Sequence, residues 1–404
     1  MSLKRTLTLP LLILYGLGNI LGAGIYVLIG EVAGVAGLFT PLSFLLTSIL
    51  LITTAFTYSE LSSRYPVSAG EAVYLFKAFA NQRLSFVIGI MIIITGVLSA
   101  AAIAVGFSGY LQVFVDVSQG SAITTLLLIL GLLAIWGIRQ SVSVAALLTL
   151  IEILGLLIII WVGQDHLTFA PIVERVDTLF DGDSSIWYGI LAGSFLAFYA
   201  FIGFEDMVNV AEEVIEPEKN MPKAIMVSLL VAGGIYMLVS LVSINAITPQ
   251  TLAQSKAPLA LLYQQITGFS PVVITAIAML AVVNGALIQI IMGSRVLYGM
   301  SQQGWLTKLF SRIHPRTNTP VYATITIVLI IYILALWLPL VTLAKMTSLF
   351  ILIIFTLMHL SLLKIKSTKQ AINSDIRCYH FSIPLIGLIT NIVFIIAYYA
   401  IDIG

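Results

Sequence analysis

The chain has 404 residues, of which 60% are hydrophobic and 9% are charged, and its formal net charge is +1. A soluble domain is typically about 25% charged, so this composition excludes a soluble protein and places most of the chain in lipid. The near-neutral balance excludes a nucleic-acid binder, which would present a basic face. The one cysteine, Cys378, excludes an internal disulfide bond.

Apolar runs of about 20 residues, the length of a membrane-spanning helix, occur eleven times. We expect helices at 10–37, 39–63, 84–114, 121–139, 142–163, 186–211, 224–247, 272–299, 320–339, 341–363 and 381–402. The runs are continuous and do not alternate with period two, so strands are not expected. The intervening loops are too short for a separate core. We predict a single all-α integral membrane domain with about 11 transmembrane helices.

Lysine and arginine predict the orientation of these helices. With a cytoplasmic N-terminus, sixteen of the nineteen Lys and Arg residues fall at cytoplasmic helix ends, as in most multi-span proteins. The first apolar run is longer than that of a signal peptide and lacks a clear cleavage site, so we expect it to be retained. The compact chain with short tails favours a prokaryotic inner membrane.

Four glycines interrupt the first expected helix, and they are Gly16, Gly18, Gly22 and Gly24. A glycine inside a helix costs about 1 kcal/mol relative to alanine. Close helix packing is one explanation, because Gly18 and Gly22 form the GxxxG pattern of membrane helix pairs. The other explanation, which we favour, is a segment that is unwound within the membrane.

The sixth expected helix carries two carboxylates inside its apolar run, Glu205 and Asp206, shortly after Gly203. Ionisable groups at membrane depth are costly and usually face a cavity or a partner. Adjacent helical residues diverge by about 100°, so at most one of the two faces a given site.

The interrupted helices are the first and the sixth, which is the pattern of a 5+5 inverted repeat with two broken helices. The repeats would span about 10–163 and 186–363, and 381–402 would be an extra helix. A break exposes backbone N–H groups, which bind a carboxylate, and carbonyl groups, which bind an ammonium group. Two facing breaks therefore suit a zwitterionic amino acid.

Four segments together resemble the amino acid–polyamine–organocation (APC) superfamily. The run 18–26 resembles its first-helix motif, and 198–205 with the following loop to Ala224 resembles its sixth helix. The segment 66–74 is similar to the loop after its second helix, and 294–301 to the end of its eighth. The resemblance extends from about residue 10 to 365.

The resemblance implies a 5+5 inverted repeat that works by alternating access. It implies that the backbone of Gly22, Ala23 and Gly24 receives a substrate carboxylate, and that the backbone around Phe198 and Ala200 receives the ammonium group. Tyr199 would be the gating aromatic residue. Asn19 and Phe201 complete the expected substrate-binding set, although Asn19 could also contact only backbone and Phe201 could only pack. Glu205 matches a glutamate that is linked to proton sensitivity in arginine/agmatine antiporters.

The chain departs from the superfamily pattern in two places. Most members have twelve spans and this chain has eleven, which leaves dimer contacts, and so the oligomeric state, open. Proton-coupled members often have a lysine where this chain has Glu152.

Glu152 shares a helix face with Ala145, Thr149, Gly155 and Ile159, and this face has enough small residues to pack against protein. It is either a hydrogen-bonded structural glutamate, a proton carrier, a cation ligand or a partner of a cationic substrate. Because an apolar site favours the neutral acid, we hypothesise that Glu152 carries a coupled proton.

The expected function is secondary active transport of amino acids or related organic cations, coupled to protons by symport. An amino acid/amine exchanger and a non-transporting amino-acid sensor are the alternatives. The sequence has no phosphate-binding loop for ATP, and its four histidines are scattered without a metal-ligand pattern. We therefore expect no enzyme, no cofactor and no metal site.

Overall fold

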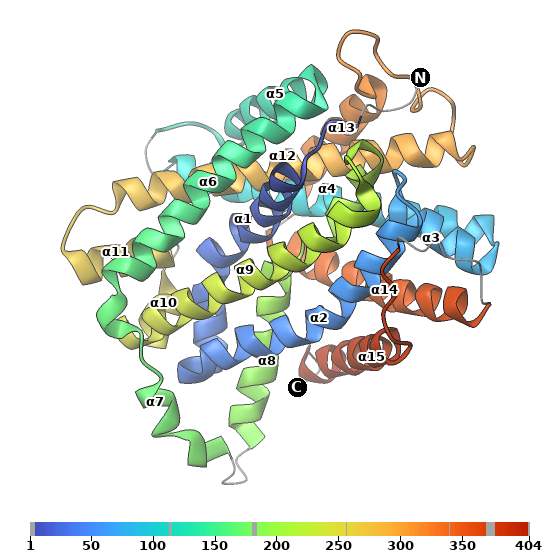
Figure 1. Ribbon diagram of the computed structural model, residues 1–404. Coiled ribbons are helices and arrows are strands. Elements are labelled where there is room, and N and C mark those ends of the chain that lie inside the picture. The colour runs from blue at the N-terminus through green and yellow to red at the C-terminus, as the bar shows by residue number, and fades with distance from the viewer. Residues whose placement is uncertain are drawn as a thin grey trace.

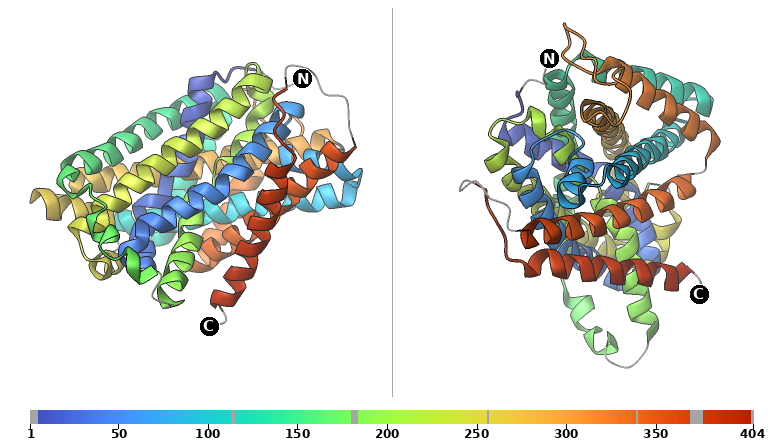
Figure 2. Two further views of the ribbon diagram at one scale, coloured as in Figure 1. Left: turned by 60° about the horizontal axis from the view of Figure 1, so that its bottom comes forward. Right: turned by 90° about the vertical axis from the view of Figure 1, so that its right-hand side faces the viewer.

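The computed structural model describes residues 5–112, 115–179, 184–255, 257–338, 340–368 and 376–402. These parts of the chain are helical, apart from turns and one isolated parallel β-bridge between Leu7 and Val214. Most long helices run in roughly the same direction across the molecule, as the left view of Figure 2 shows. This arrangement is that of a membrane-spanning bundle.

Eleven long helices correspond to the eleven predicted spans. They are α1 (Leu9–Ala36), α2 (Thr40–Arg64), α4 (Gln82–Gln112), α5 (Gln119–Trp136), α6 (Ile138–Val162), α8 (Ser184–Phe201), α9 (Pro217–Ala246), α12 (Val272–Gln302), α13 (Val321–Trp337), α14 (Leu340–Ser367) and α15 (Ser382–Asp402). By length and apolarity, nine stretches of the described residues are long enough to cross a membrane, and two shorter apolar helices lie at Val321–Trp337 and Ser382–Ala397. The prediction of an all-α membrane protein is confirmed.

Short elements connect these helices. They are α3 (Gly70–Phe79), α7 (Ala170–Val173), α10 (Pro249–Gln254), α11 (Pro258–Thr267) and the 3-10 helices η1 (Gly37–Phe39), η2 (Gln164–His166), η3 (Val176–Leu179) and η4 (Glu205–Glu213). The predicted sixth span, 186–211, is thus divided between α8 and η4. The ninth and tenth spans were expected to meet in a tight turn over residues 338–340. Helix α13 ends at Trp337 and α14 begins at Leu340, and residue 339 lies outside the described residues.

Local sequence explains several helix ends. Proline lies at the first or second position of α1, α2, α9, α10 and α11, where its missing N–H is not needed and its fixed φ suits the helix. Ser118 precedes α5 and accepts a hydrogen bond from the Ser121 N–H, and Gly137 ends that helix with φ +155°.

Helix α1 lies in the interior, packed against α6, α8, α9 and α12 (Figure 1). Its residues from Tyr15 to Leu21 are all buried. Apolar side chains cover the outside of the bundle instead, for example Leu132, Trp161 and Ile396, each more than 60% exposed. Because no water satisfies backbone groups in lipid, irregular backbone in α1 is tolerated only through this enclosure by protein.

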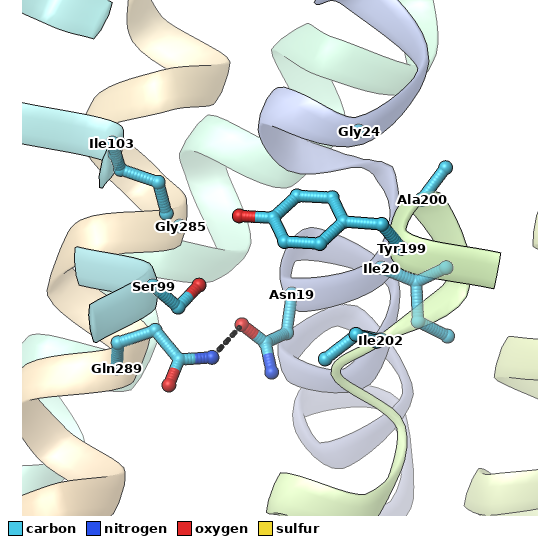
Figure 3. A pocket seen from close by; sticks show the side chains of 10 residues that line it. All are labelled: Asn19, Ile20, Gly24, Ser99, Ile103, Tyr199, Ala200, Ile202, Gly285 and Gln289. Atoms are coloured by element: carbon cyan, nitrogen blue, oxygen red, sulfur yellow. Dashed lines mark hydrogen bonds between the residues drawn. The ribbon is translucent and has the colours of Figure 1, made fainter. Parts of the chain in front are cut away.

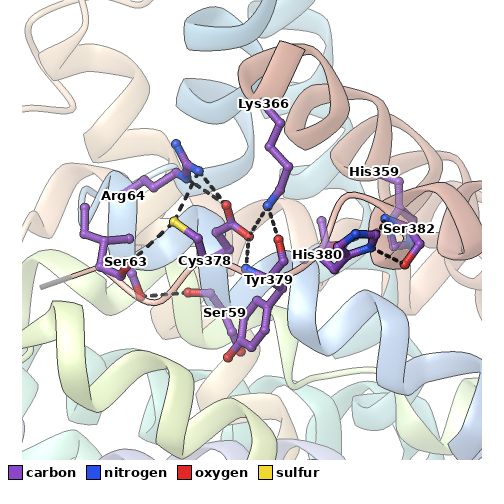
Figure 4. A network of polar contacts seen from close by, with 12 residues as sticks. Ser59, Ser63, Arg64, His359, Lys366, Cys378, Tyr379, His380 and Ser382 are labelled. Atoms are coloured by element: carbon purple, nitrogen blue, oxygen red, sulfur yellow. Dashed lines mark hydrogen bonds and ion pairs between the residues drawn. The ribbon is translucent and has the colours of Figure 1, made fainter. Parts of the chain in front are cut away.

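A buried carboxylate joins three separate segments at one end of the bundle. Glu60 of α2 accepts from Arg64 Nη2 at 2.5 Å, from Lys366 Nζ of α14 at 2.8 Å and from the Tyr379 N–H at 3.0 Å. Figure 4 shows these partners around the segment that leads into α15. The right view of Figure 2 shows α14 and α15 side by side, and the Glu60 cluster fixes α2 to this pair.

Candidate functional site

Helix α1 loses helical geometry at Gly22, where φ is −38° and ψ is −129°. Two residues later, at Gly24, the backbones of α1 and α8 approach each other closely. A Cβ added to Gly24 would lie 2.7 Å from Ala200 Cα and 2.9 Å from its carbonyl oxygen. Both explanations offered for the glycines therefore hold, because the helix is broken at Gly22 and packs backbone to backbone at Gly24. The predicted break in the first span is confirmed.

The second break follows the end of α8 at Phe201. Gly203 has φ +134°, a left-handed conformation that favours glycine, and the chain continues as the 3-10 helix η4. The Gly203 N–H donates to Glu205 Oε2 at 2.9 Å, and its carbonyl accepts from Asn19 Nδ2 at 2.8 Å. The predicted break in the sixth span is confirmed, and Asn19 links it to α1.

Tyr236 of α9 reaches both broken helices. Its hydroxyl lies 2.5 Å from the Ile20 carbonyl oxygen and 2.9 Å from the Ala200 carbonyl oxygen. The Ala200 region is where an ammonium group was expected. In this conformation the single O–H proton of Tyr236 is shared between the Ile20 and Ala200 carbonyl oxygens.

A small cavity of about 30 Å³ lies between the two breaks, α4 and α12 (Figure 3). Its lining residues are Asn19, Ile20, Gly24, Ser99, Ile103, Tyr199, Ala200, Ile202, Gly285 and Gln289. That volume admits roughly one or two water molecules and not an amino acid. The conformation is therefore closed around its site.

Four of the predicted substrate-binding residues line this cavity, namely Asn19, Gly24, Tyr199 and Ala200. Gly22 lies beside it at the break, where an added Cβ would be 3.5 Å from the Ala281 carbonyl oxygen. Ala23 belongs to α1, but its side chain lies outside the described residues.

The other two predicted aromatic side chains pack elsewhere. The Phe198 ring contacts the rings of Phe355 and Phe394, and the Phe201 ring contacts those of Phe44 and Tyr236. Packing was the alternative interpretation of the Phe201 ring, and it holds, whereas Tyr199 faces the cavity. Phe198 was expected to contribute its backbone, and the packing of its ring does not bear on that prediction.

Asp206 and Gln289 were not among the predicted site residues. Asp206 Oδ2 accepts from Asn19 Nδ2 at 2.5 Å and from Gln289 Nε2 at 2.7 Å, and Gln289 also donates to Asn19 Oδ1 at 3.2 Å. Asp206, rather than Glu205, therefore meets the residues that line the cavity. A glutamine within the apolar run of α12 was a signal for this contact, since buried polar groups in a membrane need partners.

Glu152 lies on another side of α1 and does not line the cavity. Its Oε1 accepts from Asn284 Nδ2 at 2.9 Å, while its Oε2 has no hydrogen-bond partner. Gly18 makes room for this pair, because an added Cβ would overlap Asn284 and Thr149. The predicted face is fully buried, so the expectation that it packs against protein is confirmed.

Comparison with known proteins places the chain in a family. The profile of a family described as amino acid permease matches residues 7–402. A vacuolar cationic amino acid transporter of Arabidopsis thaliana is 31% identical over 386 residues, which cover 90% of this chain and 60% of that protein. The branched-chain amino acid permease BcaP of Bacillus subtilis is 28% identical, covering 93% of this chain and 84% of its own length.

A solved structure supports the fold. A Na⁺-coupled sialic acid symporter, in a substrate-bound outward-open state, matches with a TM-score of 0.66 and 14% identity over 98% of this chain and 90% of that one. At this identity the likeness concerns the fold alone.

The chain spans about 60% of the length of the plant relative. The predicted superfamily is confirmed, and the permease class argues against an enzyme. The chain belongs to the amino acid permease family.

Proposed function

We propose that the protein is a secondary transporter of amino acids that works by alternating access. The observation that carries this proposal is the meeting of two broken helices, at Gly22 and Gly203, beside one small cavity inside a membrane-spanning bundle. Membership of the permease family supports it. In this proposal the two five-helix halves are related as inverted repeats around the cavity.

The backbone at the breaks would hold the ends of the amino acid. The N–H groups of Gly22, Ala23 and Gly24 receive the carboxylate, because freed N–H groups at a helix break carry partial positive charge. The carbonyl of Ala200 receives the ammonium group after the Tyr236 hydroxyl moves away. The Tyr199 ring then covers the substrate, as aromatic rings do for cations.

Asn19 would couple substrate binding to the contact between the two broken helices. Its amide bonds the Gly203 carbonyl oxygen and Asp206, so a substrate at the cavity touches a side chain that holds α1 to η4. The roughly 30 Å³ cavity must expand before a substrate enters. Separation of α1 from the α8–η4 segment is the movement that this geometry favours.

Proton coupling is the second part of the proposal, with symport as the mode and exchange as its alternative. Glu152 and Glu205 are the predicted coupling residues. Each is buried, with one carboxyl oxygen hydrogen-bonded and the other without a partner. A buried carboxyl group with one oxygen free of hydrogen bonds suits a proton carrier, since that oxygen can take up the proton and the neutral acid then has an O–H donor that the carboxylate lacks.

The Glu152→Gln variant tests this coupling. A glutamine keeps the size and the hydrogen bond to Asn284 but cannot release a proton, so uphill uptake driven by a pH gradient is expected to be abolished while exchange continues. The measurement is radiolabelled uptake and counterflow in proteoliposomes, with wild type beside the variant. Unchanged pH-driven accumulation would remove Glu152 from the mechanism.

Substrate and direction are tested with the same preparation. A panel of amino acids and polyamines is supplied with and without an inward proton gradient. Gradient-dependent accumulation of one class supports symport, and flux only after preloading supports an exchanger. Saturable binding without flux supports a sensor. Relatives named as transporters of cationic amino acids, branched-chain amino acids and methylthioribose define the breadth of the panel.

The proposed location is a prokaryotic inner membrane with the N-terminus in the cytoplasm. It rests on the sixteen Lys and Arg residues at one set of helix ends. Cysteine-accessibility labelling of intact cells at either terminus would decide the orientation.

A further inference from the structure

Another buried carboxyl group, that of Glu71, lies outside the site described above. Glu71 is in the first turn of α3, directly after the loop that follows α2, and is 1% exposed. The Tyr58 and Tyr74 hydroxyls and the Asn209 side chain lie near its carboxyl group. Glu71 Oε2, both of these hydroxyls and Asn209 Nδ2 have no hydrogen-bond partner. A buried carboxyl in this state needs a proton or a ligand.

The loop that directly precedes Glu71 packs tightly against η4 and α12. Ser68 Oγ donates to Glu212 Oε2 at 2.9 Å, and the Gly70 N–H donates to Asn209 Oδ1 at 3.1 Å. A Cβ on Gly299 would lie 2.6 Å from the Ser68 carbonyl group. The position of Glu71 is therefore set by the packing around it.

The geometry of η4 connects this place to the substrate cavity. A 3-10 helix has three residues per turn, so Asp206, Asn209 and Glu212 share one face. Asp206 is bonded to Asn19 and Gln289 at the substrate cavity. Glu212 lines a second cavity of about 430 Å³ with Val67, Ser68, Tyr298, Gly299, Gln302 and Gln303. Glu71 lies beside the middle residue, Asn209.

The charged and titratable groups around Glu71 are acidic or neutral. Tyr58 faces it from α2, Tyr74 from α3, and Asp206 and Glu205 from η4. In the described part of the chain no lysine, arginine or histidine pairs with it. Burial raises the pKa of Glu71 from an ordinary value of 4.5 to about 8, so the closed conformation holds it protonated at neutral pH.

We propose that Glu71 is a proton-binding residue that passes protons between Asp206, beside the substrate cavity, and the second cavity, on the side predicted to be cytoplasmic. In each transfer, the Glu71 O–H bond breaks and its proton passes to water that enters from the second cavity, leaving a carboxylate. The neutral Glu71 acid is restored when this carboxylate takes the proton lost by the Asp206 carboxyl group. The transport role of this relay rests on the proposed function, whereas proton binding by Glu71 does not.

The direction of the pH effect follows from the raised pKa. Water that reaches Glu71 on opening returns its pKa towards 4.5, so opening releases a proton between about pH 4.5 and 8. Opening on this side is therefore favoured as pH rises through that window, and the closed form is favoured as pH falls.

Infrared difference spectroscopy on the purified full-length protein tests proton binding directly. The difference between the wild-type and Glu71→Gln spectra is expected to contain a protonated-carboxyl band that disappears with a midpoint near pH 8, because the bands of Glu152 and Glu205 are common to both proteins and cancel. Glu212→Gln, on the same face of η4, is the matched control and should retain the band. Glu71→Asp should keep a titrating band with a shifted midpoint. If the wild-type and Glu71→Gln spectra show no difference in this band across the titration, the proposal is overturned.

Transport assays test the relay. With a substrate that the wild type accumulates, Glu71→Gln is expected to lose at least tenfold of pH-driven accumulation and to retain counterflow. Normal accumulation in this variant would overturn the relay while leaving the transporter intact. An absence of any flux in the wild type would instead contradict the proposed function, and the infrared titration would still decide whether Glu71 binds the proton.

Discussion

The Glu213→Gln variant is expected to lower the free energy of unfolding by about 3–5 kcal/mol. Glu213 at the end of η4 accepts from Arg295 Nε of α12 at 2.7 Å, and the two side chains are 0% and 1% exposed. Glutamine would leave the guanidinium group buried without a counter-charge, and most of the cost comes from that unpaired charge. We expect the loss as a lower thermal unfolding midpoint in detergent, followed by tryptophan fluorescence.

The double variant Glu213→Leu with Arg295→Met is the control for this interpretation. Replacing a buried ion pair by apolar side chains of similar volume is often neutral or stabilising, so the double variant should regain most of the lost stability. If both variants are equally destabilised, the unpaired charge is not the cause. If Glu213→Gln matches the wild type, the ion pair does not stabilise the fold.

The Gly24→Ala variant is expected to abolish transport, with a fall of more than tenfold in uptake. The added methyl group would lie 2.7 Å from Ala200 Cα and 3.0 Å from Ala200 Cβ, and backbone cannot yield as a flexible side chain does. Overpacking of this kind typically costs about 1–3 kcal/mol. Here it also separates α1 from α8 at the site itself, so function should suffer more than stability.

Gly234→Ala in α9 is the matched control. Nothing lies within 4 Å of a Cβ at this position, and alanine favours the helix by about 1 kcal/mol relative to glycine. This variant should therefore be as stable as the wild type or slightly more stable, with normal uptake. Wild-type uptake by Gly24→Ala would contradict the close approach of the two helices.

The sequence predicts the helices and the two breaks because lipid imposes strong constraints. Each span requires a long apolar run, so the eleven long helices follow from composition. Glycines and carboxylates are costly inside such runs, which made Gly22 and Gly203 visible as breaks. The buried face of α6 around Glu152 was predictable for a similar reason, since small residues at helical spacing indicate packing against protein.

The choice between Glu205 and Asp206 could not be predicted in the same way. It depends on the left-handed turn at Gly203 and on the continuation of the chain as a 3-10 helix, whose residues rotate by about 120° instead of 100°. The aromatic residues present the same difficulty. The Tyr199 ring faces the cavity, whereas the Phe201 ring packs against Tyr236. This difference depends on contacts with residues that are distant in the sequence.

The contact of Tyr236 with Ala200 bears on the difference between net uptake and exchange. Burying carbonyl groups that have no hydrogen-bond donor is costly, so a transporter with such groups in its empty site would change conformation only with substrate bound. In this protein the Tyr236 hydroxyl occupies the donor position at the Ile20 and Ala200 carbonyl groups when no substrate is present. In the transport cycle proposed above, this contact would allow the unloaded carrier to close and return without substrate, a step that net accumulation requires and that obligatory exchange lacks.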